Sequence, residues 1–318
     1  MKKALICGIS GQDGAYLAKF LLMKGYEVFG GSRDATTNNF LNLKKLKVFD
    51  DLKLVSINLT DFRSTLQTIN KIKPDEIYNL SGQSSVGLSF DQPIETFESI
   101  CIGTLNLLEA IRFCDTTIKF YNAGSSECFG NSPNEICDEN TLFKPKSPYG
   151  IAKASAHWQV ANYREAYNLF AVNGVLFNHE SPLRPERFVT QKVVKAVADI
   201  AQGKLQKLEV GNIDIIRDWG WAPDYVEAMW LMLQQETPDD FVISTGIGHS
   251  LREFIQMAFN CVNLEMDDYL IINQLFFRPT DLQYVVGNPQ KAKNVLGWSS
   301  KHDLEWIINE MYSNKINL

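Results

Sequence analysis

Short apolar runs alternate with longer amphipathic stretches in the first half of the chain, and this alternation restricts the fold more than any other feature. The predicted strands are Ala4–Cys7, Glu27–Phe29, Lys53–Ile57, Glu76–Leu80, Ile118–Asn122 and Ala171–Leu176. The predicted helices between and after them include Tyr16–Lys24, Ile100–Phe113 and Tyr149–Tyr167. Strands that alternate with helices favour a parallel sheet covered by helices on both faces, where continuous apolar strands are expected. The pattern therefore predicts a doubly wound α/β fold.

The second half is less regular. Residues 178–185 read as a loop, while Phe188–Gln202 and Tyr225–Gln235 read as helices. The sequence contains no internal repeat and no flexible linker, so a second domain is expected to be built from insertions and the C-terminal portion. We predict a larger domain over 1–175 with a returning segment near 212–245. A smaller α/β domain is predicted over 176–211 and 246–318.

Composition excludes several classes of protein. With 318 residues, 45% apolar residues and a net charge of −6, the chain resembles neither a disordered protein nor a binder of nucleic acid or anionic membranes. The six cysteines show no metal-binding spacing, so no metal is expected. The apolar start is too short for a signal peptide, and no run approaches a membrane span. These features favour a cytoplasmic enzyme.

A glycine-rich turn stands between the first strand and the first helix. Gly8, Gly11 and Gly14 form a G-x-x-G-x-x-G pattern there. Glycines let the backbone approach a pyrophosphate, and the following helix offers free N–H groups and a partial positive charge. In this position the pattern predicts a Rossmann-type dinucleotide site in the larger domain. The smaller domain would then hold the substrate.

The end of the second strand bears on the choice of cofactor. An acidic side chain there binds the ribose 2′-hydroxyl of NAD, whereas an arginine accommodates the 2′-phosphate of NADP. This chain has one of each, Arg33 followed by Asp34. Arg33 could pair with a phosphate, and Asp34 would repel one only if it pointed inward. The residues leave the choice open and lean toward NADP.

Four polar residues form a candidate catalytic group. Tyr149 and Lys153 are four apart, hence on one face of a helix, and a lysine ammonium beside a phenol lowers its pKa toward that of a usable base. Ser125 and Glu127 follow a strand end, where ligands of such sheets bind. A carboxylate there suggests proton transfer beyond hydride transfer. The alternative is that Glu127 caps or pairs with the next loop.

Several strings in order carry a resemblance to a known family. They are Gly8–Leu17, Asn79–Ser84, Ser147–Gly150, Asn178–Pro182, Arg217–Gly220, Asp224–Trp230 and Phe277–Asp281. With these strings the chain resembles the extended short-chain dehydrogenase/reductases, and within them the GDP-mannose 4,6-dehydratases, almost from end to end. The resemblance implies a lyase that holds a nicotinamide cofactor and dehydrates a GDP-sugar in deoxysugar biosynthesis. It also implies a homodimer or homotetramer.

The resemblance also implies residue roles. Tyr149 would be the base at sugar C4, supported by Lys153 and Ser125, and Glu127 would be the second catalytic acid–base group. The cofactor, NADP with NAD as the alternative, would be held by Gly8, Gly11, Gln12, Asp13, Gly14, Arg33, Asn58, Leu59, Leu80, Tyr149 and Lys153. The GDP-sugar would be held by Ser84, Asn178, Lys192, Arg217, Arg278 and Asp281. His179 is interpreted as structural.

The chain departs from the family pattern at five positions, several of which lie near the expected nucleotide-sugar. The departures are Asp34 for a second Arg, Pro185 for Gly, Gln191 for Arg, Asp281 for Glu and Gln283 for Asp. Asp34 bears on the preference for NADP, and the departures near the sugar leave open a related GDP-sugar such as a GDP-heptose. A 4-keto reductase or epimerase of the same fold is a separate alternative, and Glu127 is the residue that discriminates against it. A non-catalytic cofactor-binding protein is disfavoured because the candidate catalytic residues are all present.

Overall fold

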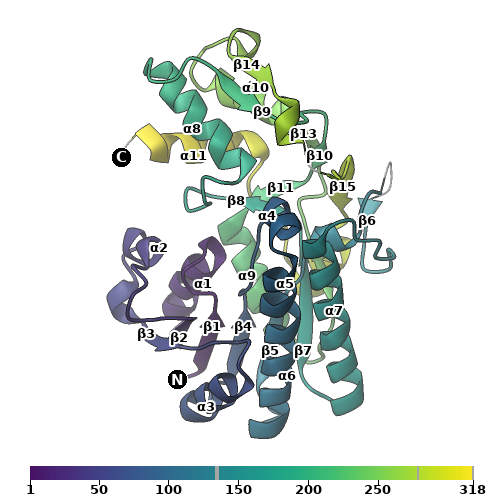
Figure 1. The fold of residues 1–318 in the computed structure, drawn as a ribbon. Helices are drawn as coiled ribbons and strands as arrows, with labels where there is room; N and C mark the ends of the chain where they lie inside the picture. Colours follow the sequence, from purple (N-terminus) through teal and green to yellow (C-terminus); the bar gives the residue numbers. More distant parts are fainter. Residues whose placement is uncertain (133–135, 278, 317–318) are drawn as a thin grey trace.

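The computed structural model describes residues 1–132, 136–277 and 279–316, and a seven-stranded parallel sheet organises the larger part of the molecule (Figure 1). The strand order is β12-β7-β5-β4-β1-β2-β3. These strands are β1 (Lys3–Cys7), β2 (Glu27–Ser32), β3 (Lys53–Ser56), β4 (Glu76–Asn79), β5 (Lys119–Ala123), β7 (Ala171–Leu176) and β12 (Phe241–Ile243). The order reverses between β1 and β4, which creates the crevice where ligands of such sheets bind. The predicted doubly wound α/β fold is confirmed.

Helices cover both faces of the sheet. They are α1 (Gln12–Met23), α2 (Leu41–Lys45), α3 (Phe62–Ile72), α4 (Val86–Asp91), α5 (Pro93–Phe97), α6 (Gly103–Cys114), α7 (Pro148–Tyr167) and α9 (Ala222–Leu233). Strand β1 explains the layers: Ala4 and Ile6 join the core with α1 and α9, whereas Leu5 and Cys7 join the core with α3, α6 and α7. Both sides of the strand are buried, which accounts for its unbroken apolar sequence.

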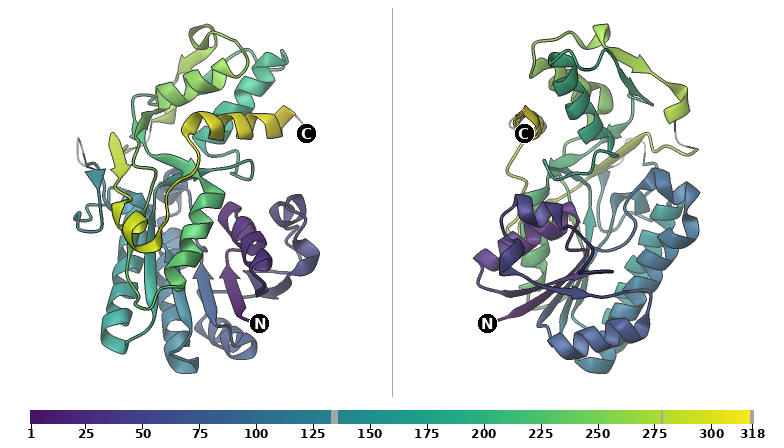
Figure 2. Two further views of the ribbon diagram at one scale, coloured as in Figure 1. Left: turned by 180° about the vertical axis from the view of Figure 1, so that it is seen from behind. Right: turned by 60° about the vertical axis from the view of Figure 1, so that its left-hand side comes forward.

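A smaller part lies beyond the carboxyl ends of the large sheet (Figures 1 and 2). Its helices are α8 (Val189–Ala201), α10 (Leu251–Asn260) and α11 (Leu304–Ile316), which share one apolar core. Its short strands are β6 (Ile136–Cys137), β8 (Asn178–Glu180), β9 (Leu208–Val210), β10 (Ile216–Arg217), β11 (Trp219–Trp221), β13 (His249–Ser250), β14 (Leu270–Ile272) and β15 (Tyr284–Gly287). Within 212–245, α9 packs on the large sheet and β12 extends it, whereas β10 and β11 pair with strands of the smaller part. The exact boundaries predicted for the two domains, such as the one after residue 175, stay a prediction.

Three sequence predictions need correction. The first helix begins at Gln12 and not at Tyr16, because the second half of the glycine-rich turn is already helical. The stretch 178–185 is not all loop, since β8 pairs in parallel with β11. The first three residues of the helix predicted over Ile100–Phe113 belong to a π-helical segment, Glu98–Ile102, and α6 begins only after it.

A search of the described helices finds none that is both long enough and apolar enough to cross a membrane. In the same described ranges, no group of three or more His, Cys, Asp or Glu side chains is arranged to hold a metal ion. Both findings concern only those ranges.

Candidate active site

A cavity of about 450 Å³ lies at the carboxyl ends of the large sheet, between it and the smaller part. Eleven predicted site residues line it: Asp13, Leu80, Ser84, Ser125, Glu127, Tyr149, Lys153, Asn178, Lys192, Arg217 and Asp281. The other predicted cofactor residues lie outside this lining: Gly8, Gly11, Gln12, Gly14, Arg33, Asn58 and Leu59. Arg278 lies outside the described residues. The fold thus brings the predicted catalytic group and most of the predicted substrate residues into one space.

The turn between β1 and α1 fits a dinucleotide. Gly8 has φ +89°, and a Cβ on it would lie 2.7 Å from the carbonyl oxygen of Leu80. A Cβ on Gly14 would lie 2.4 Å from the carbonyl oxygen of Gly8. Among the described residues no side chain caps α1 at Gly11, so its first N–H groups face outward from an uncapped helix start. Close backbone approach and uncapped N–H groups are what a pyrophosphate requires.

The start of α7 places Tyr149 and Lys153. Ser147 caps the helix by accepting a hydrogen bond from the backbone N–H of Gly150 at 3.0 Å, and Pro148 suits the first turn. Lys153, one turn after Tyr149, donates from Nζ to the carbonyl oxygen of Ala123 at 2.8 Å. That carbonyl belongs to the end of β5. The contact fixes the lysine beside the strand end that carries the other candidate catalytic groups.

The structure corrects the prediction that Lys153 lowers the pKa of Tyr149. Burial raises the pKa of the Tyr149 phenol, a hydrogen bond with Ser125 lowers it in part, and the negative charge of Glu127 raises it. Burial also lowers the pKa of Lys153, to about 8. The Lys153 ammonium lies 5.8 Å from the centre of the Tyr149 ring and bonds to a backbone carbonyl. Burial therefore outweighs the hydrogen bond of Ser125 and the positive charge of Arg184, which both lower the pKa of Tyr149.

Glu127 lies in a 3₁₀ turn directly after β5, half-buried at the cavity wall. Its backbone N–H donates to the side chain of Ser125 at 3.3 Å. A Cβ on Gly150 would lie 2.8 Å from the Glu127 carbonyl oxygen, so the glycine lets α7 approach this turn closely. The close approach puts the carboxylate near enough to Tyr149 to affect its pKa.

The opposite side of the cavity carries positive charge. Arg217, buried at the end of β10, donates to the carbonyl oxygen of Ile216 at 2.9 Å and lies 3.5 Å from Asp281. Lys192 on α8 lies 4.2 Å above the ring of Phe276. Such a pair of cations beside an aromatic ring suits a nucleoside diphosphate.

Two arginines of the cavity were missed by the sequence predictions. Arg184 lies 3.4 Å from Glu180, stacks 3.8 Å above the ring of Phe188, and its charge lowers the pKa of Tyr149. Arg187 donates to the hydroxyl of Ser84 at 3.2 Å. The available signal was their position in a polar stretch directly after a strand that ends at the cavity.

Residues at the ends of β2 and β3 lie away from the cavity. The Arg33 side chain is 79% exposed and lies 3.6 Å from Glu95. Asn58 accepts hydrogen bonds from the backbone and hydroxyl of Thr60, at 3.2 and 2.9 Å. Leu59 is buried. These contacts stabilise the loops next to the glycine-rich turn and leave Arg33 accessible.

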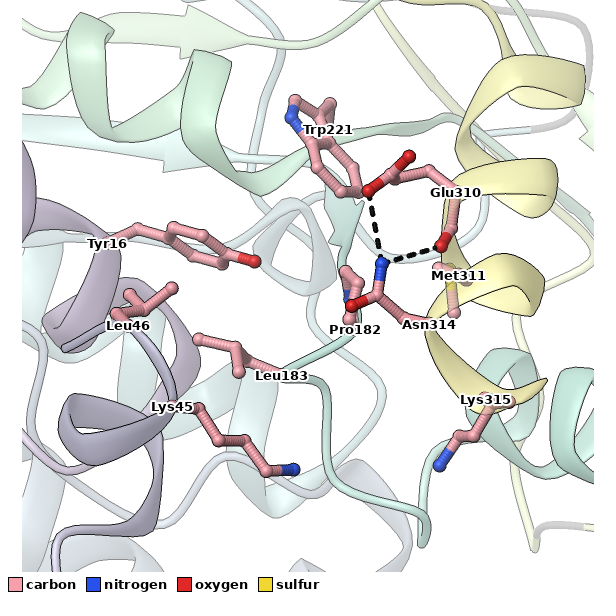
Figure 3. A pocket seen from close by; sticks show the side chains of 10 residues that line it. All are labelled: Tyr16, Lys45, Leu46, Pro182, Leu183, Trp221, Glu310, Met311, Asn314 and Lys315. Atoms are coloured by element: carbon pink, nitrogen blue, oxygen red, sulfur yellow. Dashed lines mark hydrogen bonds between the residues drawn. The ribbon is translucent and has the colours of Figure 1, made fainter. Parts of the chain in front are cut away.

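A second cavity, of about 420 Å³, lies between α1, α2 and α11 (Figure 3). Its lining is Tyr16, Lys45, Leu46, Pro182, Leu183, Trp221, Glu310, Met311, Asn314 and Lys315. Asn314 donates to the backbone and side-chain oxygens of Glu310, both at 3.1 Å. Its lining includes none of the predicted catalytic residues, so we assign the chemistry to the first cavity.

Comparisons with known proteins bear on what this site does. The sequence model of the GDP-mannose 4,6 dehydratase family matches residues 5–311. GDP-mannose 4,6 dehydratase 2 of Arabidopsis thaliana is 46% identical over 327 residues, which span 100% of this chain and 87% of the plant protein. The Homo sapiens GDP-mannose 4,6 dehydratase is 43% identical over 340 residues, spanning 99% and 91%. The UDP-glucose 4-epimerase of Thermus thermophilus, solved with NAD, covers 99% of both chains with a TM-score of 0.86 and 24% identity.

The two kinds of likeness establish different things. At 24% identity, the epimerase structure shows a shared fold and nothing more about the chemistry. The sequence matches extend through both parts of the molecule, including the segments that line the cavity. They confirm the resemblance inferred from the motifs. The chain belongs to the GDP-mannose 4,6-dehydratase family.

Proposed function

We propose that this protein is a hydro-lyase that converts GDP-mannose to GDP-4-keto-6-deoxymannose in deoxysugar biosynthesis. The observation that carries the proposal is that Glu127 lines the same cavity as Tyr149 and Lys153. A simple alcohol dehydrogenase needs only the latter pair with a hydroxyl such as that of Ser125. The family match and the cations at the far side of the cavity support a GDP-sugar as substrate.

In the proposed reaction, side chains of the protein accept and donate protons. Tyr149 accepts the proton of the C4 hydroxyl, with Ser125 hydrogen-bonding the same oxygen. A nicotinamide cofactor, held at the glycine-rich turn and beside Tyr149 and Lys153, would supply the hydride chemistry at C4 and C6. With C4 a carbonyl, the C5 proton becomes acidic, and Glu127 removes it while the C6 hydroxyl leaves as water with a proton from the site. C5 is finally reprotonated, so water is lost without net redox change.

Mass spectrometry of GDP-mannose incubated with the protein and trace cofactor in heavy water tests the proposal. We expect a product lighter by one water that carries one solvent deuteron at C5, with no accumulation of reduced cofactor. An unchanged sugar would overturn the proposal for GDP-mannose. Turnover of a GDP-heptose would then support the first alternative. Net consumption of reduced cofactor would support a 4-keto reductase, and inversion at C4 an epimerase.

We propose NADP as the cofactor, with NAD as the alternative. The support is the engagement of Asp34, whose carboxylate accepts from the backbone and hydroxyl of both Thr36 and Thr37. These hydrogen bonds lower the pKa of Asp34 and hold its charge within its own turn. Arg33 beside it is exposed and available to a 2′-phosphate.

Arg33→Ala should weaken NADP binding about tenfold, because it removes a hydrogen bond to the charged 2′-phosphate. NAD has no 2′-phosphate, so its binding should be unchanged. Competition between the two cofactors, followed by chromatography of the bound fraction, measures this. Asp34→Asn is the matched control, since an amide oxygen can still accept from Thr36 and Thr37. Equal losses for both cofactors in Arg33→Ala would contradict the assignment.

We further propose a homodimer as the minimal assembly, from which a tetramer would be built, and a cytoplasmic location. The support for the dimer is a set of exposed apolar side chains on the neighbouring helices α5 and α7: Ile94, Phe97, Ile151 and Trp158. Adjacent exposed apolar groups favour an interface.

The support for the cytoplasmic location is the scattered spacing of the cysteines in the sequence.

Trp158→Glu should raise the dimer dissociation constant roughly thirtyfold or more, because it places a charge on a large apolar anchor. Sedimentation equilibrium over a range of protein concentrations measures the shift. Met23→Glu is the control, since Met23 is 79% exposed on α1, away from these helices. A dimer that persists equally in both variants would show that the interface lies elsewhere.

A further inference from the structure

A charged pair joins the start of α1 to β8 at one wall of the cavity. The Nε2 atom of His179 lies 2.9 Å from Oδ2 of Asp13. The His179 side chain is 9% exposed and that of Asp13 is 22% exposed. Both residues line the cavity, and neither transfers a proton in the proposed reaction. Their role therefore needs a separate explanation.

The hydrogen bonds of His179 fix its protonation. Its Nδ1 lies 2.7 Å from the carbonyl oxygen of Phe177, which can only accept, so Nδ1 carries a proton. Its Nε2 faces the Asp13 carboxylate. Burial opposes ionisation of Asp13, but the charge and hydrogen bond of His179, and the amide of Gln12, lower its pKa to about 2. An ionised carboxylate also only accepts, so Nε2 is protonated too and the ring is an imidazolium.

The neighbouring charges favour this state on balance. Burial lowers the pKa of His179, but the charge and hydrogen bond of Asp13 raise it by more. The positive charge of Arg184 opposes the imidazolium, and the carboxylate of Glu180 lies close enough to interact with it. The nearest carboxylate, in direct contact with the ring, outweighs the more distant arginine.

The face of the imidazole ring is covered by Tyr225 of α9. The two rings stack with centres 4.6 Å apart and planes 26° apart, which favours a cation on the tyrosine face. Gly220 makes this stacking possible, because a Cβ there would lie 2.3 Å from the Tyr225 ring. Trp298 packs against Tyr225 in a T-shaped arrangement, with ring centres 5.7 Å apart. The ring of His179 is thus held in orientation by a built aromatic stack.

Further hydrogen bonds connect the same two segments. Gln12 donates to the carbonyl oxygen of His179 at 3.2 Å and accepts from the hydroxyl of Ser181 at 2.7 Å. Together with the ion pair, they tie the first turn of α1 to β8, which presents Asn178 to the cavity. We propose that His179 is a positioning residue that, as an imidazolium, fastens the cofactor-binding end of α1 to β8 and thereby sets the register between cofactor and sugar.

This inference rests on the proposed function for its catalytic consequence. The proposed reaction needs a hydride to leave C4 and return to C6 of the same sugar, so the register between α1 and β8 must hold through both transfers. If α1 and β8 can shift relative to each other, the two hydride transfers become uncoupled. The second transfer needs C6, and not C4, to lie at transfer distance from the cofactor. Uncoupling is distinct from a general loss of folding or of binding.

Histidine-selective NMR of the holoenzyme tests the protonation without any substrate. The chain has four histidines, His157, His179, His249 and His302, so their signals can be resolved. We expect His179, identified by loss of its signal in His179→Gln, to keep both ring nitrogens protonated above the pH at which an ordinary histidine loses its proton. If that variant does not fold, Gln variants of the other three identify it by elimination. A His179 that loses its proton at no higher pH than an ordinary histidine would overturn the proposal.

Kinetics of Asp13→Asn then tests the positioning. The amide keeps the shape of the side chain but removes the charge, so the His179 signal should titrate at lower pH. Turnover should fall about tenfold, with reduced cofactor and unreacted keto-sugar accumulating. His302→Gln is the control, because His302 pairs with Asp224 at 3.2 Å outside the cavity.

The outcomes separate this inference from the proposed function. Uncoupling in Asp13→Asn but not in His302→Gln would support the positioning role, whereas coupled turnover in both would overturn it. If the unaltered protein does not act on GDP-mannose, the proposed function fails. The NMR titration of His179 in the unaltered holoenzyme and in Asp13→Asn still decides whether the imidazolium and its ion pair exist.

Discussion

Glu127→Gln should abolish dehydration while leaving the first hydride transfer intact. An amide cannot take the C5 proton, so overall turnover should fall about 100- to 10,000-fold. The oxidation at C4 depends on Tyr149 and Lys153, which this change leaves in place, so reduced cofactor should build up to one equivalent per site. Stopped-flow absorbance of the reduced cofactor and deuterium incorporation at C5 measure the two steps separately.

The control for this variant addresses the structural alternative for Glu127. If its main role were to hold the turn after β5 or the following loop, Glu127→Gln would lower the melting temperature and weaken nucleotide binding as well. We expect neither, because the backbone N–H bond to Ser125 and the close approach of Gly150 hold the turn without the carboxylate. Near-normal turnover, or continued exchange at C5, would contradict the catalytic role of Glu127.

The large sheet could be predicted from the sequence because its strands are buried on both faces. Ala4–Cys7 is apolar throughout, and only a parallel sheet with helices on both sides buries every residue of such a strand. Strand β8 could not be predicted in the same way. Its three residues, Asn178, His179 and Glu180, are polar, and they form a strand only because β11, some forty residues later, pairs with them. Such non-local pairing leaves no local pattern.

The candidate site was predicted where motif residues are close in sequence. Tyr149 and Lys153 share a helix face, and Ser125 and Glu127 share a turn, so spacing alone placed each pair. The electrostatics could not be predicted, because spacing does not report burial. Burial reverses the expected direction of the pKa of Tyr149. The charge of His179 was missed for a second reason, because its partner Asp13 is 166 residues away in the sequence.

Tyr149→Phe should lower turnover about a thousandfold or more, since it removes the phenolic oxygen that accepts the C4 proton. The pH dependence of the unaltered protein carries the further test. The active form has Tyr149 ionised and Lys153 protonated. Burial raises the pKa of Tyr149, so below pH 8 the ionised fraction, and with it the rate, increases with pH. Above about pH 8, the fraction of protonated Lys153 falls with pH by the same factor by which the fraction of ionised Tyr149 rises. The population of the active form, and with it the rate, should therefore level off.

Lys153→Arg is the variant that separates these two ionisations. A guanidinium stays protonated throughout this range, so the rate of this variant should continue to increase above pH 8, where the unaltered protein levels off. Initial rates of product formation between pH 6 and 10 measure both profiles. If the plateau persisted in Lys153→Arg, Lys153 would not be the group that titrates. If Tyr149→Phe kept substantial turnover, the base would have to be sought elsewhere in the cavity, with Glu127, whose charge acts on the pKa of Tyr149, as the first candidate.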